Sequence, residues 1–254
     1  MELQSVRTLS TVFVFILFLI LERAHPFFKG RKSLNTHDVK NVIISLLNML
    51  IVIVVFSWVL GRAGSFTFGL FNLLDLPSLL EMVLIVLVFD LWMYAWHVWN
   101  HTSSFLWRFH RMHHTDTLVD ASSAFRFHPG EIVMSTALRI VIMTVLGLQL
   151  WHILVYELLL LPVIMFHHSN INIGARFDQL LRLVFASPFM HKIHHSDIRN
   201  ETDSNYGSVF SFWDRLFRSY TMRSDPENIA QGLKDMKTTK WTDIIGMVKT
   251  PLQT

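Results

Sequence analysis

The stretch HRMHHTD, residues 110–116, is nearly repeated at residues 191–197 as HKIHHSD. Both stretches read His-x-x-His-His, followed by a hydroxyl residue and an aspartate. On a helix, positions i, i+3 and i+4 lie on one face. We therefore expect the histidines of each stretch to point the same way: His110, His113 and His114 in the first, and His191, His194 and His195 in the second.

The chemistry that such clusters suit is metal binding. HVWNH adds His97 and His101, four residues apart, to the six histidines above. Neutral imidazole is a common ligand of Fe, Zn, Cu and Ni. Eight imidazoles exceed the needs of one tetrahedral metal, whereas two adjacent metals would use four or five each. Packed together without a ligand, the rings would leave buried donors and acceptors unsatisfied. The spacing therefore predicts a metal site.

Isolated histidines have a simpler interpretation. His25, His37 and His152 each lie apart from the clusters, next to apolar segments. We expect them to be amphipathic residues at a membrane interface.

The composition is that of a membrane protein. The 254 residues are 52% hydrophobic and only 16% charged, against about 25% charged in soluble domains. The chain has no cysteine, which excludes disulfides and thiolate metal sites. Its sequence pI of 9.3 is attributed to membrane topology, because the basic residues lie between apolar runs. No nucleic-acid partner is expected.

Apolar runs predict four to five membrane helices, since a bilayer core needs about 20 apolar residues. They cover residues 9–21, 42–60 and 79–96, and two shorter passes share residues 132–166 with a turn near 147–149. The last pair could be a hairpin that does not fully cross. The first run is interpreted as an uncleaved anchor rather than a signal peptide, because no A-x-A site follows it.

Basic residues predict the orientation. The segment 22–40 carries five of them, and from Arg108 onward all but Arg139 lie outside the runs, on one side. The positive-inside rule then places residues 22–40, 97–131 and 167–254 in the cytoplasm. The two distant histidine clusters would thereby meet on the cytoplasmic face. The five basic residues of the first segment are Arg23, Lys29, Arg31, Lys32 and Lys40.

The order and spacing of these motifs resemble one known family. HVWNH, HRMHH and HKIHH look like the three histidine boxes of the fatty acid hydroxylase and sterol desaturase superfamily. FRFHPGE, FHHSN and ETDSNYGSVFSFWDRLFRSY are also similar to its signatures, so that the resemblance covers about residues 80–220. FRSY, residues 217–220, departs from the Phe-Gly-Thr-Tyr of many members, which puts only a local turn in doubt.

The resemblance implies a non-haem di-iron centre that uses O2. His168, which precedes Ser-Asn, matches a ninth ligand, and His167 is expected to be a neighbour that faces lipid or protein. His128 is counted as a metal candidate, with a supporting role as the alternative. Asp116 and Asp197 could orient ligand imidazoles or could simply cap helices or face solvent. The implied ligands are His97, His101, His110, His113, His114, His168, His191, His194 and His195.

The implied fold is an all-α, multi-pass membrane bundle with a cytoplasmic, histidine-rich helical cap. Residues 1–75 would supply N-terminal membrane helices, residues 76–222 the catalytic domain and residues 223–254 a cytoplasmic tail. In that tail, Asp225-Pro226 predicts a helix start, and an apolar segment around Ile245 would lie on the membrane or pack onto the domain.

The implied reaction hydroxylates or desaturates a lipid, and the sequence selects neither the reaction nor the lipid. HPGE, residues 128–131, resembles a cytochrome b5 haem motif, but the surrounding domain is lacking, and no nucleotide-binding fingerprint occurs. Electrons are therefore expected from a ferredoxin or cytochrome b5 with its reductase. An acidic donor would suit a basic face formed by Arg199, Arg215, Arg218 and Arg223, although topology alone also accounts for these charges.

Two alternatives come from other functional classes. A membrane metal transporter or metal-binding scaffold would place its ligands at the midplane of the spans, whereas these histidines lie at or beyond helix ends. A zinc hydrolase would need fewer ligands and a carboxylate base beside an open metal position.

Overall fold

Five long helices form the body of the protein. The computed structural model describes residues 2–30, 35–63 and 69–253, and these residues contain no β-strand. The five helices have the length and hydropathy of membrane spans, so the predicted all-α membrane fold is confirmed. They are α1 (Glu2–Ala24), α2 (Asn35–Ala63), α3 (Ser78–Thr102), α5 (Pro129–Leu146) and α6 (Leu150–His168).

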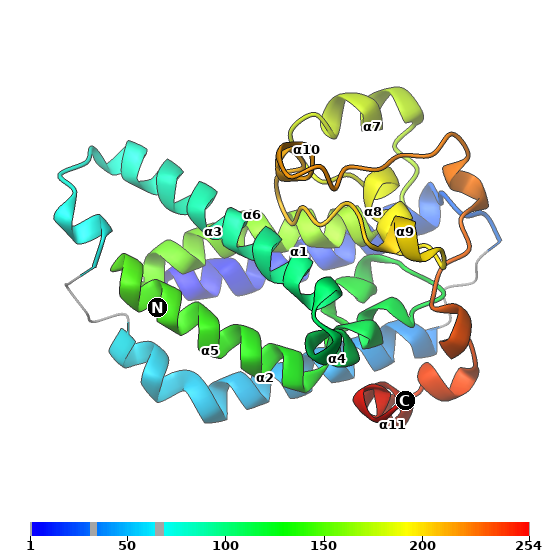
Figure 1. The fold of residues 1–254 in the computed structure, drawn as a ribbon, viewed down its shortest axis with the longest axis horizontal. Helices are drawn as coiled ribbons and strands as arrows, with labels where there is room; N and C mark the ends of the chain where they lie inside the picture. The colour runs from blue at the N-terminus through cyan, green and yellow to red at the C-terminus, as the bar shows by residue number, and fades with distance from the viewer. Residues whose placement is uncertain (1, 31–34, 64–68, 254) are drawn as a thin grey trace.

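Short helices gather at one end of this bundle (Figure 1). α4 (Ser104–His114) follows α3, and the chain after α6 returns to the same end. The opposite end holds the connection between α2 and α3, with the 3-10 helix η1 (Phe71–Leu73), and the turn between α5 and α6. The remaining α-helices are α7 (Ala175–Leu181), α8 (Pro188–His194), α9 (Arg199–Thr202), α10 (Phe212–Leu216) and α11 (Ile244–Val248). The remaining 3-10 helices are η2 (Ala121–Phe125), η3 (Pro226–Asn228), η4 (Lys234–Met236), η5 (Thr239–Trp241) and η6 (Thr250–Leu252).

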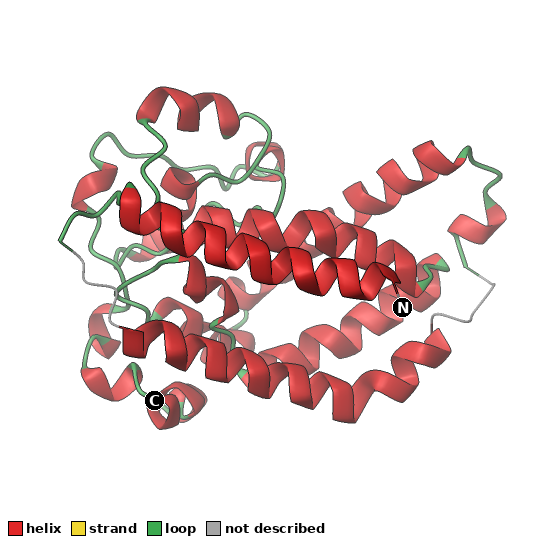
Figure 2. Ribbon diagram, turned by 180° about the vertical axis from the view of Figure 1, so that it is seen from behind, coloured by secondary structure: helices red, strands yellow, loops and turns green. Residues whose placement is uncertain are grey.

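Long-range packing joins segments that the sequence separates. α1 packs along α6, and α2 packs along α5; both N-terminal helices lie in front in Figure 2. The domain bounds at residues 75 and 222 remain predictions. Arg31 and Lys32, counted above for orientation, lie outside the described residues.

The turn between α5 and α6 lies at the predicted place. Gly147 ends α5 with φ of +74°, a left-handed conformation that favours glycine. A side chain there would also collide with Asn72, because an added Cβ would lie 1.9 Å from its Oδ1 atom. Each of the two helices that this turn joins qualifies as a span of its own.

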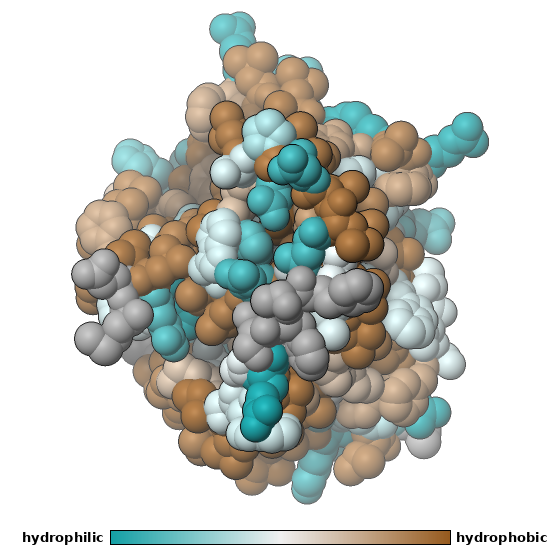
Figure 3. Space-filling model, turned by 90° about the vertical axis from the view of Figure 1, so that its left-hand side faces the viewer, coloured by the Kyte–Doolittle hydropathy of each residue, from teal (hydrophilic) through white to brown (hydrophobic). Residues whose placement is uncertain are grey.

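The outer surface of the bundle is apolar. Leu9 and Phe13 on α1, and Val54 and Trp58 on α2, are all more than 60% exposed. Hydrophobic side chains cover much of the surface seen from the end where α1 begins (Figure 3). Large exposed apolar surfaces mark membrane contact, and the bundle fits that setting.

A buried carboxylate of α3 binds the segment around residues 209–213. Asp90 accepts hydrogen bonds from the Tyr156 hydroxyl (2.8 Å), the Val209 and Phe210 backbone N–H groups (3.1 Å each) and the Trp213 indole (2.9 Å). It is fully buried, and its four donors satisfy a charge that would otherwise be costly in this core. Asp90, one of two acidic residues within the third predicted apolar run, thus has a structural role.

The tail folds back over α4 and α2. Met247 of α11 packs with Ile44 and Met112, while Ile245 is exposed, so one side of this short helix packs onto the protein and the other does not. η3 begins at Pro226, after Asp225, as predicted. The carbonyl of Thr250 accepts from Arg111 at 3.0 Å.

Two of the isolated histidines are not interface residues. His37 is buried, and its Nε2 lies 2.9 Å from Asp116 and its Nδ1 3.2 Å from Asp120. His152 is also buried, and its Nδ1 accepts from the Gln149 N–H at 3.0 Å, which closes the first turn of α6. His25 is exposed.

Candidate metal centre

Helix boundaries place the histidines at one end of the bundle. His97 and His101 occupy the last two turns of α3. Ser103, in an extended conformation, separates α3 from α4 and accepts from the Leu106 N–H at 3.4 Å, a hydroxyl cap that suits a helix start. α8 begins in the same way, with Ser187 as its cap and Pro188 in its first turn.

The structure brings all nine implied ligands together in two groups. Within each group, one nitrogen of every ring lies within 4.8 Å of the others. We call them the first and second histidine groups. The first contains His97, His101, His110, His114 and His194, and the second contains His113, His168, His191 and His195.

Each His-x-x-His-His motif is shared between the two groups. The first motif gives positions i and i+4 to the first group and its middle histidine, His113, to the second. The second motif does the reverse, since His191 and His195 join the second group and His194 joins the first. On a helix of 3.6 residues per turn, position i+4 is rotated by about 40° from i in one direction and position i+3 by about 60° in the other, so that i+3 and i+4 diverge by about 100°. The expectation that all three rings point the same way was therefore too coarse.

The two groups adjoin. The ring centroids of His114 and His195, one from each group, lie 4.7 Å apart and are stacked. His191 and His194 are separated by 5.0 Å. The two groups therefore form one continuous cluster of imidazoles.

Backbone carbonyls hold two rings of the first group from outside. His97 donates through Nδ1 to the Tyr206 carbonyl at 2.9 Å, and His194 donates to the Ser204 carbonyl at 2.7 Å. A proton held on Nδ1 leaves the Nε2 lone pair free to coordinate. The segment that Asp90 anchors thus also sets the orientation of His97.

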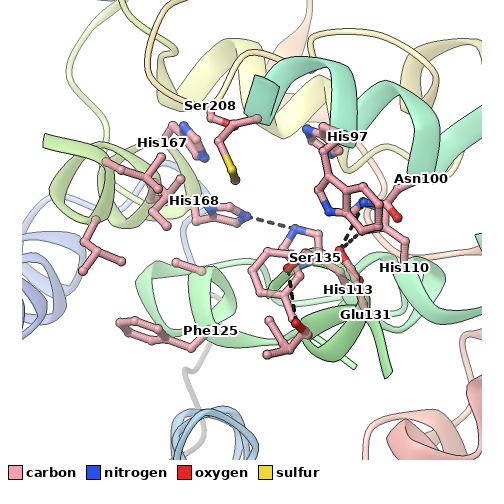
Figure 4. Close-up of a pocket in the computed structure, with 18 of the residues that line it drawn as sticks. His97, Asn100, His110, His113, Phe125, Glu131, Ser135, His167, His168 and Ser208 are labelled. Atoms are coloured by element: carbon pink, nitrogen blue, oxygen red, sulfur yellow. Dashed lines mark hydrogen bonds and ion pairs between the residues drawn. The ribbon is translucent and has the colours of Figure 1, made fainter. Parts of the chain in front are cut away.

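Carboxylates hold two more rings of the first group. His101 Nδ1 lies 3.1 Å from Asp203, and His110 Nδ1 lies 2.9 Å from Glu131 (Figure 4). Sequence reasoning assigned neither role, although both acids lie in stretches that resemble family signatures. The resemblance of these stretches to family signatures was the signal that could have identified the two acids. Which histidine each acid contacts depends on the fold.

Asp116 and Asp197, for which orienting a ligand and capping a helix or facing solvent were the alternatives, pair with other residues. Asp116 is ion-paired with His37 and accepts from Ser123 at 2.6 Å. Burial favours its neutral form, but His37 and Arg126 outweigh burial, so that the pKa of Asp116 lies below its ordinary value. Asp197 pairs with Lys237 at 2.7 Å. Both aspartates follow a histidine motif directly in the sequence, but their side chains contact residues other than the grouped histidines.

The nitrogen atoms that face inward fit a cation. Within the described residues, Nε2 of His97, His101, His110 and His194 is buried without a hydrogen-bond partner. In the second group, Nε2 atoms face one another: His168 lies 3.1 Å from His113 and 3.0 Å from His191. Lone pairs at such distances repel unless a proton or a metal lies between them. The donor set therefore fits metal ions that accept imidazole.

Burial keeps these imidazoles neutral. It lowers the pKa of His113, His114, His191 and His195 well below the ordinary value, and neighbouring imidazoles add to the shift. Burial likewise lowers the pKa of His194 to about 3. Neutral rings need not release a proton before they bind a metal.

Two further histidines lie beside these groups. His128, a metal candidate above, is outside both: its Nδ1 accepts from the Gly130 N–H at 2.9 Å and its Nε2 donates to the Val248 carbonyl at 3.0 Å. With both nitrogens engaged, its role is to begin α5 and hold the tail. His167 is buried, and its ring lies 4.0 Å from that of His191, but it belongs to neither group.

A cavity of about 270 Å³ opens beside the histidines (Figure 4). His97, His110, His113, His168 and His191 line one end of it. Side chains of α2, α3, α5, α6 and the η2 segment line the rest; most are apolar, and the polar ones include Ser135, Arg139 and Glu157. Its walls reach from the short-helix end of the bundle into the membrane spans.

Comparison with known proteins agrees with the histidine pattern. The fatty acid hydroxylase family model matches residues 82–219, more than half of the chain. Ornithine lipid hydroxylase OlsE of Rhizobium tropici is 26% identical over 62% of this chain and 46% of its own length. Human alkylglycerol monooxygenase is 25% identical over 57% of the chain and 31% of its own length. Cholesterol 25-hydroxylase of Rattus norvegicus is 26% identical over 61% of the chain and 51% of its own length.

The matched region covers about a third to a half of each of these relatives. No solved structure matches the chain. All nine grouped histidines lie inside the matched residues, as do Glu131 and Asp203. The chain belongs to the fatty acid hydroxylase family.

Proposed function

We propose that this protein is an O2-dependent di-iron oxidoreductase that hydroxylates a lipid. One observation carries the proposal: nine imidazoles, eight of them buried and that of His97 half-buried, form two adjacent groups in a chain of this family. Two irons, with five and four of these ligands, account for the whole set.

The overall reaction converts R–H, O2, two electrons and two protons into R–OH and water. Bound iron would supply the reduction of O2, which no side chain can perform. The protein would hold the metals through nine rings, orient four of them through Tyr206, Ser204, Asp203 and Glu131, and keep bulk water away by burial. Outer partners of this kind typically contribute about 10–100-fold to metal affinity or activity.

The lipid would reach the histidines through the cavity, whose walls include Leu160, Leu161 and Ile164 of α6. The relatives are named for ornithine lipid, alkylglycerol and cholesterol, three different lipids, and all three names denote hydroxylation or mono-oxygenation. Hydroxylation is therefore favoured over desaturation.

Electrons would come from a separate reductase with a ferredoxin or cytochrome b5, at the cytoplasmic face. Arg199 and Arg223, suggested above as part of a docking face, already pair with Asp203 and Asp225. Arg215 is likewise engaged, since its guanidinium lies 4.1 Å from the Tyr220 ring centroid and donates to the Arg182 carbonyl. The proposal of an external electron donor therefore depends on the two electrons that the reaction needs, and these arginines do not support it.

The test is incorporation of ¹⁸O from ¹⁸O2 into lipids by the purified protein in a bilayer, with iron and a reductase–donor pair. Hydroxylated lipid with one ¹⁸O atom is expected. Omission of the donor or replacement of iron by zinc should abolish product, because zinc has no redox chemistry. Turnover by the zinc form would contradict the proposal, and metal uptake into vesicles without lipid oxidation would favour the transporter alternative.

A further inference from the structure

Three charged side chains meet among the membrane helices, away from the histidines. Glu157 of α6 pairs with Arg7 of α1 at 2.6 Å and with Arg139 of α5 at 3.0 Å. The side chains are between 15% and 30% exposed. Two guanidinium groups and one carboxylate leave one net positive charge at this place.

Arg139 of this cluster lines the cavity, and Arg7 does not. One terminal nitrogen of Arg139 bonds Glu157, and the other lies 3.9 Å from the Met93 sulfur, a weak acceptor. Its Nε is buried and has no acceptor among the residues that the structure describes. Arg139 thus brings unused donor capacity to the cavity, beside the carboxylate of Glu157, which also lines it.

The cavity extends from this cluster to the histidines along one face of α6. His168 follows Glu157 by eleven positions, which corresponds to about 16 Å of helix. The intervening lining is apolar. The α6 residues that line it recur at helical spacing: Glu157, Leu160, Leu161, Ile164, His167 and His168.

We infer that Arg139 binds the anionic oxygen group, carboxylate or phosphate, of an elongated lipid, whose chain lies along α6 toward the histidines. The carbon that is oxidised would then be remote from the anionic group. The oxidation rests on the proposed function, whereas the binding does not. Arg139 is in this view a specificity-determining residue.

Electrostatics favours an anion at this place. A charge within membrane spans is costly unless it is paired, and Glu157 compensates only one of its two arginines. A guanidinium binds carboxylate and phosphate through several N–H groups at once. A neutral lipid oxygen would leave the second positive charge without compensation.

The experiment is equilibrium binding of tritiated oleate to the full-length protein in micelles, with oleate, oleoyl phosphate and methyl oleate as competitors. Both anions should compete at least about tenfold better than the ester, because one charge-assisted hydrogen bond contributes that much. The anion that competes better identifies the headgroup chemistry.

Arg139→Gln should weaken anion binding by at least about tenfold and change methyl oleate binding by less than about threefold. Arg7→Gln is the matched comparison: it removes the excess positive charge of the same cluster but no donor from the cavity, and should weaken anion binding clearly less than Arg139→Gln does. Arg139→Lys should retain most of the preference, and it keeps the test decisive where the Gln variant folds poorly.

Equal affinity of the wild-type protein for oleate and methyl oleate would overturn the inference. So would equal losses in the Arg139→Gln and Arg7→Gln variants, because that result indicates a purely structural ion pair. Binding needs neither iron nor turnover. A protein that discriminates the anion but forms no ¹⁸O product would contradict the proposed function alone.

Discussion

At the scale of single residues, His114 lies where the two histidine groups meet. Its ring contacts His101, His194 and His195, with centroid distances of 4.7–4.8 Å. Neither of its nitrogens has a hydrogen-bond partner within the described residues. A buried imidazole with both nitrogens unpaired is costly, unless a metal occupies one of them.

We expect His114→Ala to lower iron content and hydroxylation by more than about 100-fold, the upper end of what outer partners of a metal contribute. His152→Ala is the control, since it removes one hydrogen bond near the distal turn and should cost about 1 kcal/mol of stability. Iron analysis and product formation at equal protein level measure both. Equal loss in the two variants would show that the ligands are misassigned.

Acid should destabilise the metal-free protein. The pKa of His194 is about 3 in the folded state and near 6.5 when unfolded. Between these values the unfolded chain binds more protons, so stability falls as pH falls. His113, His114, His191 and His195 act in the same direction. Asp214, whose pKa burial raises to about 6, opposes this effect, as do Asp120 and Asp203, whose pKa values burial also raises.

The measurement is the thermal midpoint of metal-free protein at pH 7.5, 6.0 and 5.0. A steady decrease is expected over this range. The lowered pKa of Asp116 acts only below about pH 4, so it does not contribute there. A midpoint that stays constant from pH 7.5 to 5.0 would contradict the neutral state of the grouped histidines.

At the scale of elements, the site depends on how segments are joined. The loop that carries Tyr206 is tied to α3 through Asp90 and to α10 through Asp214, which accepts from the Tyr206 and Gly207 N–H groups at 2.7 and 2.9 Å. Arg218, at the departure from the family pattern, has φ of +62°. This conformation is the one that glycine adopts more readily, so the family's usual residue would suit the same turn.

Asp90→Ala should destabilise the protein by about 3 kcal/mol or more, because it leaves four buried donors without an acceptor. We also expect iron loss, since the Tyr206 carbonyl that orients His97 belongs to the loop that is released. Thermal unfolding and iron content are the measurements. Asp75→Ala, at an exposed position, is the control and should leave stability nearly unchanged. Full iron occupancy in Asp90→Ala would contradict the role of this loop in holding the metal site.

At the scale of the whole molecule, the five spans alternate in direction, so that the short helices and all grouped histidines lie at one end (Figure 1). The end that faces the cytoplasm remains a prediction from the basic residues. The chain has no cysteine, which makes single introduced cysteines clean reporters of the topology.

We expect Ser224→Cys to be labelled by a membrane-impermeant maleimide only from the cytoplasmic side, and Asp75→Cys only from the opposite side. Both positions are exposed and lie at opposite ends of the bundle. Sealed vesicles of known orientation provide the assay. The reverse labelling pattern would refute the positive-inside assignment and would move the proposed electron donor to the other compartment.

The sequence by itself determined the membrane helices, the turn at Gly147 and the histidines that meet. These features depend on local properties: the length of apolar runs, the conformational preference of glycine, and helical spacing of i, i+3 and i+4. The paired histidine boxes and the alternation of spans were enough to place nine rings at one end.

Only the tertiary structure decided how those rings are divided and what holds them. Glu131 and Asp203 reach their imidazoles across 21 and 102 positions of the chain, and Arg139 reaches Glu157 from another helix. His37 and Asp116, which are 79 positions apart, pair with each other. His37 therefore does not face the membrane interface, and Asp116 does not orient a metal-ligand imidazole. Such pairings follow from the angles at which helices pack and from the burial of charge, and neither quantity is encoded in the spacing of residues within one helix.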